Sequence, residues 1–237
     1  MSASFEKGYN ALKEQVDAAD ASFFSSCVHC GMCAEACLFF TETGAPERTP
    51  INKTEPLRRV WKQEYTLLGR IGKIFGLGKK VTDEMLQQWE TLVYDSCTLC
   101  GRCSMVCPVG NDIAGMIRKT REGMAAAGHA PVGLVGATKR AVTIGSPMGV
   151  KLPALLAQIA HVEKDTGMTI PVDVKGADYM LLLSSMEIMN FPEFIEAVAK
   201  IFKHASVSWT ISSEAFEATN SGIQIGVSDI AAELVQR

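Results

Sequence analysis

The stretch that decides the fold reads Cys27-Val-His-Cys-Gly-Met-Cys-Ala-Glu-Ala-Cys37, and the chain repeats its spacing at Cys97-Thr-Leu-Cys-Gly-Arg-Cys-Ser-Met-Val-Cys107. Both copies follow C-x-x-C-x-x-C-x-x-x-C, and together they contain all 8 cysteines. Three closely spaced cysteines followed by a fourth are typical of the ligands of 4Fe-4S clusters. The sequence therefore predicts two 4Fe-4S clusters and a role in electron transfer.

The spacing also predicts which cysteines bind which cluster. Gaps of two residues let a tight loop place three sulfurs around one cluster, whereas the gap of three turns the fourth cysteine toward the other cluster. We expect all eight cysteines to bind iron in a crossed arrangement. Cluster 1 would be held by Cys27, Cys30, Cys33 and Cys107, and cluster 2 by Cys97, Cys100, Cys103 and Cys37.

Other roles for these residues are less consistent with the pattern. Zinc also binds C-x-x-C pairs, but it would leave the third and fourth cysteines of each motif unexplained. We expect His29 to shape its loop rather than to bind metal, because four thiolates already complete the site. Gly31 and Gly101 would let backbone N–H groups approach a cluster, and Arg102 would supply positive charge nearby.

Length and charge exclude several classes of protein. The 237 residues suffice for one large or two small domains. The formal net charge is -3, and acidic and basic residues are interspersed, so we expect no basic stripe that would bind nucleic acid or anionic lipid. We see no secretory signal and no apolar run long enough to span a bilayer. Eight cysteines in a reducing compartment bind metal more readily than they form disulfides. We therefore expect a cytoplasmic protein.

Apolar residues at helical spacing dominate the first half of the chain. They predict one helix that is capped by Ser4 and continues to Phe23, and a helix beginning near Pro56. They also predict a helix capped by Thr82, and a helix that begins at Asn111-Asp112 and ends at Gly128. Its buried stripe would be Ile113, Met116, Ile117, Thr120 and Met124. The segment from Gly69 to Lys80 contains glycines and basic residues but matches no phosphate-binding motif, so we interpret it as a solvated loop.

The character of the sequence changes near residue 177. Tyr179 to Leu183 would form a buried strand, Asn190 with Glu193 would cap a helix, and Val207 to Ile211 would form a second strand parallel to the first. A last helix is expected over 228–236. The fold class is α+β: a mainly α-helical ferredoxin domain over 1–131, a bridging segment over 132–176 with a helix around Leu155, and a small parallel α/β lobe over 177–237.

About sixty residues separate the two motifs, which resembles the α-helical ferredoxin arrangement. The sequence from Cys97 to Ile117, followed by Gly128-His-Ala-Pro, resembles the C-type iron-sulfur subunit of heterodisulfide reductase. It also resembles the corresponding protein of the cytoplasmic heterodisulfide-reductase-like complex of sulfur oxidisers. In such families a cysteine-rich domain with C-C-G motifs follows. Residues 177–237 resemble a truncated C-C-G domain without its cysteines, with Ser184 and Ser185 where a cysteine is expected and Glu214-Ala-Phe216 near a C-C-G position.

The resemblance implies an electron-transfer subunit that is not itself catalytic. Its partners would be a cysteine-rich C-C-G catalytic subunit and a flavin or iron-sulfur subunit, in a hetero-oligomer that handles sulfur compounds or disulfides. One alternative is the iron-sulfur subunit of an anaerobic glycerol-3-phosphate or 2-hydroxy acid dehydrogenase. Another is an assembly or sensing protein with structural clusters. An enzyme in its own right is disfavoured by the missing cysteines of the last lobe.

Overall fold

The computed structural model describes residues 3–77, 80–217 and 219–236. The chain divides into two compact units. The first comprises Met1–Pro131 together with Ile225–Val227, and the second comprises Val132–Gln224 and Ser228–Arg237. The mainly helical first unit and the small parallel sheet of the second confirm the expected α+β class.

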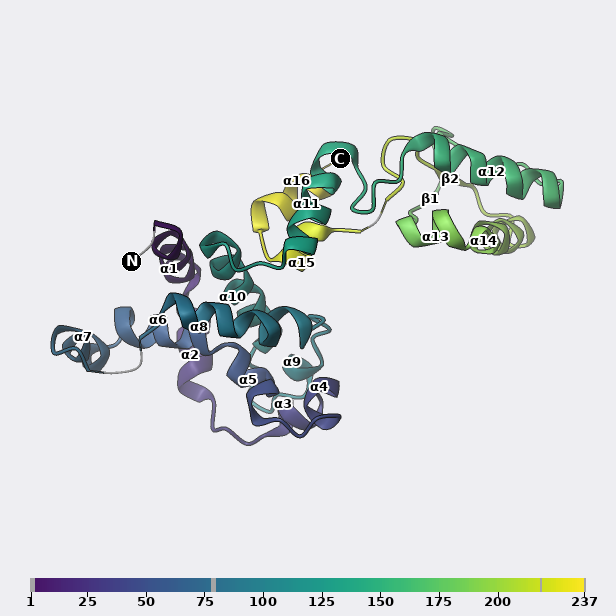
Figure 1. Cartoon of the computed structure of the whole chain (residues 1–237). Coiled ribbons are helices and arrows are strands. Elements are labelled where there is room, and N and C mark those ends of the chain that lie inside the picture. Colours follow the sequence, from purple (N-terminus) through teal and green to yellow (C-terminus); the bar gives the residue numbers. More distant parts are fainter. Residues whose placement is uncertain (1–2, 78–79, 218, 237) are drawn as a thin grey trace. The chain divides into compact units, whose positions relative to one another are not determined.

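The first unit is built from helices of very different lengths (Figure 1). They are α1 (Ala3–Gln15), α2 (Ala18–Ser26), α3 (Met32–Glu35), α4 (Leu38–Thr41), the 3-10 helix η1 (Pro46–Arg48), α5 (Pro50–Lys53), α6 (Glu55–Tyr65), α7 (Leu67–Ile74), α8 (Asp83–Glu90), the π-helix η2 (Thr91–Asp95), α9 (Arg102–Met105) and α10 (Ile113–Ala127). The short helices α3, α4, α5 and α9 belong to the segments that carry or follow the cysteines.

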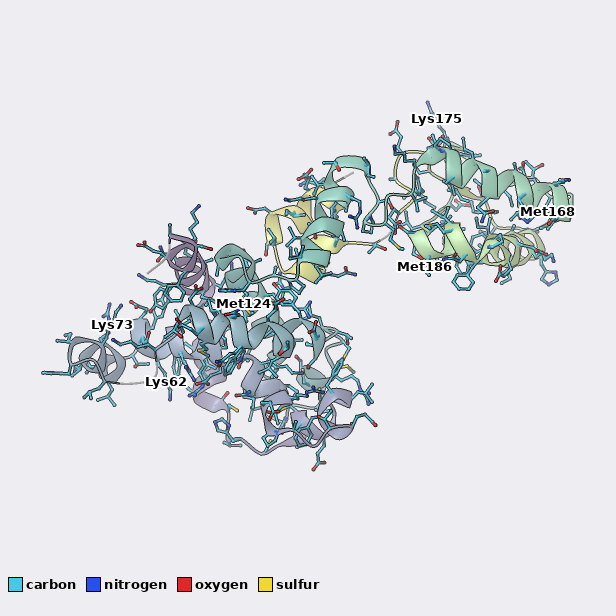
Figure 2. All side chains as sticks on the ribbon, viewed as in Figure 1. Lys62, Lys73, Met124, Met168, Lys175 and Met186 are labelled. Atoms are coloured by element: carbon cyan, nitrogen blue, oxygen red, sulfur yellow. The ribbon has the colours of Figure 1, made fainter. Side chains whose placement is uncertain are left out.

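Helices α1 and α10 form the centre of this unit because glycines let them approach closely. A side chain on Gly8 of α1 would overlap Ala127, and one on Gly123 of α10 would overlap Leu12. All five residues of the expected α10 stripe are buried, including Met124 in the interior of the unit (Figure 2). Asp112 caps the start of α10 and Gly128 its end, as predicted.

A segment from far along the chain completes this core. The Tyr94 hydroxyl lies 2.9 Å from the carbonyl oxygen of Ile225 and 3.1 Å from that of Arg121. Gly226, with φ of 90°, leaves no room for a side chain beside Arg121. Residues 225–227 are therefore part of the first unit in structure, although they follow the second unit in sequence.

Three expectations for the first unit are wrong. The N-terminal segment is two helices, because Asp17 and Asp20 form a capping box that starts α2. Ser4 lies inside α1 and does not cap it; its hydroxyl donates to the Ala127 carbonyl. The segment from Gly69 is not a loop up to Ile74 but part of α7, whose first turn is capped by Thr66. The rest of that expected loop includes residues 78–79, which lie outside the described part of the chain.

The second unit contains α11 (Val132–Ile144), α12 (Leu152–Thr166), β1 (Tyr179–Leu181), α13 (Ser185–Asn190), α14 (Pro192–His204), β2 (Trp209–Ile211), α15 (Ser221–Ile225), whose last residue joins the first unit, and α16 (Ser228–Val235). The strands β1 and β2 are parallel, with Tyr179 opposite Trp209. Residues 132–176 thus supply two helices, of which α12 packs Leu155, Ile159 and Val162 into the core beneath the strands.

Two details of the second unit differ from expectation. The strand β1 is short and half exposed rather than buried, because Tyr179 and Met180 face outward and the interior is filled from β2, which is buried throughout. The capping box is formed by Ser184 and Glu187 at α13, and Asn190 ends that helix. No helix in the described ranges has both the length and the apolar character needed to cross a bilayer.

Candidate functional site

The two cysteine motifs adopt the same backbone conformation. The residue before the second cysteine has a positive φ in each copy, 54° at His29 and 55° at Leu99. Gly31 and Gly101 follow with φ of 84° and 77°, and each caps a short helix. A left-handed conformation favours glycine, so the backbone itself requires these two residues. The sequence repeat is therefore also a structural repeat.

The helices that follow the two loops pack against each other and bring the motifs together. Helix α3 carries Cys33 and contacts α9, which carries Cys103. A first cavity of about 180 Å³ lies beside α3. Its lining includes the three cysteines at the start of motif one and the last cysteine of motif two: Cys27, Cys30, Cys33 and Cys107.

A second cavity of about 240 Å³ mirrors the first. Its cysteines are Cys37, Cys97, Cys100 and Cys103. Cys37 reaches it because the chain turns at this residue, which is the N-cap of α4. The structure thus brings the eight cysteines into two groups of four, and each group takes three residues from one motif and one from the other.

Burial makes two of the cysteines, Cys33 and Cys103, poor thiolates on their own. Burial, followed by the charge of the neighbouring Cys97, raises the pKa of Cys103 to about 11. Burial also raises the pKa of Cys33, with smaller contributions from Cys27, Cys30 and Cys107. Four sulfurs that disfavour each other's charge require a cationic centre between them. Iron would supply that positive charge.

Two buried cations lie at the second cavity. The Lys53 ammonium donates to the Ser96 carbonyl, lies 3.9 Å from the Cys37 sulfur and sits over the Phe39 ring. Arg121 donates to the carbonyl oxygens of Val93, at 2.8 and 3.0 Å, and of Cys97, at 2.5 Å. Only 1% of the Lys53 surface is exposed, and none of the ion pairs found among the described residues involves it. A buried, unneutralised ammonium favours an anionic group beside it.

The first cavity has a neutral surround. None of the residues that line it is a lysine or an arginine. Asn111 is the buried polar residue there, and its amide accepts a hydrogen bond from Ser26 at 3.0 Å and lies 3.3 Å from the Phe23 carbonyl. The two groups of cysteines therefore share one backbone design but differ in the charge around them.

The sequence interpretation missed Lys53 and Arg121. Both lie on apolar stripes: Lys53 is four residues before Leu57 and seven before Val60, and Arg121 is four residues after Ile117. A charged residue at a buried helical position is the signal that identifies such groups. Arg102, which was expected to provide positive charge, lines the second cavity.

The donor sets fit 4Fe-4S clusters. Each cavity offers four sulfurs and otherwise largely apolar walls, which is the environment of a thiolate-bound cubane. Among the described residues, no three His, Cys, Asp or Glu side chains lie at the spacing of a single metal ion. Cavities of about 180 and 240 Å³ are far larger than one zinc ion needs.

The second unit holds Ser184 and Ser185, which we expected to stand where a C-C-G domain has a cysteine. Ser184 caps α13, and Ser185 is buried, where its hydroxyl donates to the Glu217 carboxylate. The Ser146 hydroxyl lies 2.9 Å from that of Ser185 and accepts a hydrogen bond from the Val150 backbone. These groups satisfy one another, so the network explains the serines by packing alone.

Comparison with known proteins agrees with the cysteine chemistry. Residues 24–111 match the family model of the 4Fe-4S dicluster domain. The Hdr-like menaquinol oxidoreductase iron-sulfur subunit 2 of Archaeoglobus fulgidus is 24% identical over 73% of this chain. The Hdr-like menaquinol oxidoreductase iron-sulfur subunit of Archaeoglobus profundus is 23% identical over the same share. The D-type subunit of the dihydromethanophenazine:CoB--CoM heterodisulfide reductase of Methanosarcina barkeri is 24% identical over 89%.

The matches cover only part of these relatives. The chain spans 32% of the length of each Archaeoglobus protein and 50% of the Methanosarcina protein. No solved structure matches the chain. The relatives nevertheless confirm the resemblance that the second cysteine motif suggested, and the dicluster match supports 4Fe-4S clusters as the cofactors. The chain is an iron-sulfur protein that resembles the subunits of heterodisulfide-reductase-like oxidoreductases.

Proposed function

We propose that this chain is an electron-transfer subunit that carries two 4Fe-4S clusters in a heterodisulfide-reductase-like oxidoreductase. The observation that supports it most directly is the presence of two adjacent cavities, each lined by four cysteines. Two clusters held side by side on packed helices exchange electrons readily. The chain acts as a relay, and the substrate chemistry belongs to a partner.

The ligands follow the crossed arrangement. Cluster 1 is assigned to Cys27, Cys30, Cys33 and Cys107, and cluster 2 to Cys97, Cys100, Cys103 and Cys37. The composition of the two cavity walls supports this assignment. So does the electrostatic interaction of Cys33 with Cys107, which lies in the other motif.

The partners are a cysteine-rich C-C-G catalytic subunit and a flavin or iron-sulfur subunit, in a cytoplasmic hetero-oligomer that oxidises sulfur compounds or exchanges electrons with disulfides. The names of the relatives as subunits support a multi-subunit assembly. Those names also contain menaquinol and a CoB--CoM heterodisulfide, so we add a quinol to the disulfide as a proposed electron partner of the assembly. The cysteine-less lobe over 177–237 is retained for docking, since its half-exposed strand β1 presents an unpaired edge.

Anaerobic purification followed by iron and sulfide analysis and visible and EPR spectroscopy tests the relay. We expect about eight iron and eight sulfide per chain and two reducible clusters, as two cubanes require. A colourless, zinc-loaded protein would overturn the proposal. Clusters that no physiological donor reduces would instead support an assembly or sensing protein.

Isolation of the native complex tests the partner assignment separately. A companion chain with C-C-G motifs supports the proposal. A flavin dehydrogenase for glycerol-3-phosphate or 2-hydroxy acids would support the alternative subunit, and disulfide turnover by this chain alone would make it an enzyme.

A further inference from the structure

Helix α7 is packed with its apolar side outward. Leu67, Leu68, Ile71, Ile74 and Phe75 recur at helical spacing and form one face. Their exposed fractions run from 44% at Ile71 to 82% at Leu68, and Leu77 beyond the helix is 68% exposed. An amphipathic helix of a water-soluble unit normally buries this face. Here it is the side that faces solvent.

Glycine explains how α7 is held in this orientation. A side chain on Gly69 would overlap the Lys62 carbonyl of α6, so α7 approaches α6 through a glycine. Among the described elements, α7 packs extensively only on α6, whose own apolar residues Leu57 and Val60 are buried in the core. The outward face of α7 is therefore not available to the core of this unit.

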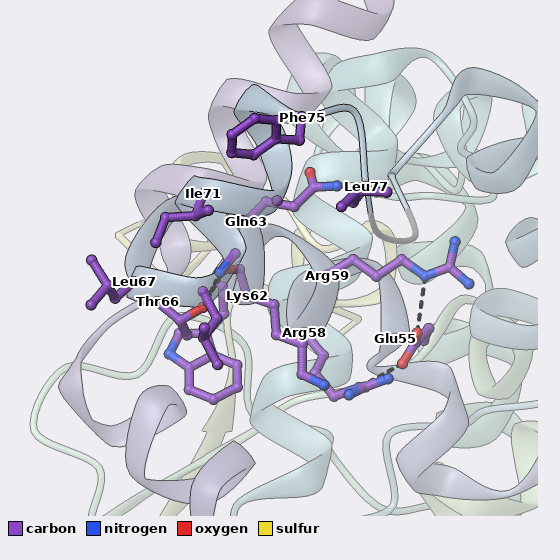
Figure 3. A pocket seen from close by; sticks show the side chains of 14 residues that line it. Glu55, Arg58, Arg59, Lys62, Gln63, Thr66, Leu67, Ile71, Phe75 and Leu77 are labelled. Atoms are coloured by element: carbon purple, nitrogen blue, oxygen red, sulfur yellow. Dashed lines mark hydrogen bonds and ion pairs between the residues drawn. The ribbon is translucent and has the colours of Figure 1, made fainter.

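An open hollow of about 880 Å³ lies between α6 and α7, and none of the residues that line it is a cysteine (Figure 3). Ile71, Phe75 and Leu77 line it on the α7 side, and Arg58 and Arg59 reach Glu55 on the α6 side. The surface thus combines apolar side chains with basic ones.

The charge around α7 is strongly positive. Residues 55–80 contain seven lysines or arginines and two glutamates, in a chain whose formal net charge is -3. Glu55 pairs with Arg58 and Arg59, and Glu64 pairs with Lys73. Among the described residues this leaves Lys62, Arg70 and Lys80 without an acidic partner. Figure 2 shows Lys62 and Lys73 beside α6 and α7.

We propose that the outward face of α7 binds the surface of a membrane that carries anionic lipids. Leucine, isoleucine and phenylalanine on one face, lysine and arginine beside it, and no acidic residue on the helix are the features of an interfacial helix. The apolar residues enter the boundary of the acyl chains while Arg70, Lys62 and Lys80 meet lipid phosphates. The net charge of the whole chain does not reveal this site, because acidic residues elsewhere outnumber the basic residues around α7.

Vesicle flotation with the full cluster-loaded chain tests the proposal. We expect the protein to float with phosphatidylcholine vesicles that contain about 30% phosphatidylglycerol and to float much less with pure phosphatidylcholine or at about 0.5 M salt. The variant Leu68→Gln, Ile74→Gln and Phe75→Gln removes three highly exposed apolar side chains. It should reduce flotation at least about tenfold with an unchanged cluster spectrum.

Matched substitutions separate this effect from general exposure of apolar residues. Val132→Gln and Ile201→Gln change two residues that are also highly exposed, and they should leave flotation unchanged. Arg70→Gln should weaken binding to anionic vesicles alone. Wild-type protein that does not float, or a triple variant that floats equally well, overturns the proposal. So does a native complex in which the triple variant loses a companion chain but vesicle binding is absent, because α7 is then a subunit interface.

Discussion

The two cysteine cavities have the same backbone conformation but different electrostatic surroundings: the first is neutral and the second is positively charged. His29 and Leu99 share a left-handed conformation, and each motif lends one cysteine to the other's cavity. However, the charged residues Lys53 and Arg121 are buried beside the second cavity, whereas the buried polar residue at the first cavity is the neutral Asn111. Repetition of a motif thus sets the geometry of ligation, while the surrounding helices set the charge. We expect cluster 2 to have the higher reduction potential, since nearby cations stabilise the added electron.

Removal of the exchanged cysteines has the largest expected effect. Cys107→Ser should abolish or convert the cluster that Cys27 binds, and Cys37→Ser should do so for the cluster that Cys97 binds, because each variant removes one of four ligands. EPR spectroscopy and iron content of the anaerobically purified variants measure this. If Cys37→Ser disturbs only the cluster of Cys27, the crossed assignment is wrong.

Replacement of the buried polar residue at each cavity comes next. Arg121→Met should lower the free energy of unfolding of the first unit by about 3 kcal/mol, since two buried carbonyl groups lose charged donors. Asn111→Ala should lower the same free energy of unfolding by about 1 to 2 kcal/mol, because Asn111 makes fewer hydrogen bonds than Arg121 and carries no charge. Denaturant unfolding followed by cluster absorbance compares them. Equal losses would mean that the charge of Arg121 contributes no stability.

Removal of the Lys53 charge should change the difference in reduction potential between the two clusters without removing a ligand. Lys53→Met should lower the reduction potential of cluster 2 by on the order of 50 to 100 mV, the effect of one partly screened charge within about 10 Å, and leave cluster 1 unchanged. Lys53→Arg keeps the charge and is the control. Redox titration monitored by EPR measures both clusters. A shift shared equally by the two clusters would contradict the electrostatic comparison.

Substitution of the left-handed residue in each cysteine loop should have the smallest effect on stability. The effect should be equal in the two motifs. His29→Gly and Leu99→Gly each relieve a left-handed residue and should stabilise the first unit by about 0.5 to 1 kcal/mol. The cluster spectra should not change, because neither side chain is expected to be a ligand. Thermal unfolding checks the stability, and a changed spectrum in His29→Gly alone would show that His29 binds or relays to cluster 1.

The sequence was informative where spacing alone determines structure. The cysteine repeat, the α10 stripe with its caps and the parallel pairing of the last two strands all follow from local patterns. The break between α1 and α2 was missed because the apolar spacing from Phe5 to Phe23 continues through it, and only the paired aspartates at 17 and 20 mark it. The outward face of α7 was missed for a different reason. Periodicity identifies an apolar face, but it does not say whether the protein interior is available to cover it.

The buried cations show a further limit of local patterns. A lysine on a helix is most often solvated, so Lys53 is recognised only when the stripe through Leu57 and Val60 is extended back to it. Its neighbours Ser96 and Cys37 are distant in sequence, and the pairing depends on how α5 packs. Sequence therefore locates the ligands of a cluster more readily than the groups that adjust its potential.

The return of residues 225–227 to the first unit affects how the protein is made. A ribosome releases Tyr94 and Arg121 long before it reaches Ile225 and Gly226, and the whole of 132–224 is synthesised in the interval. Domains generally fold as units, so a unit is complete only when all of its segments have been made. For the cluster-bearing unit that moment comes only after residues 132–224, which form most of the second unit, have been translated. We therefore expect cofactor insertion into a finished site to follow the translation of the cysteine motifs and not to accompany it.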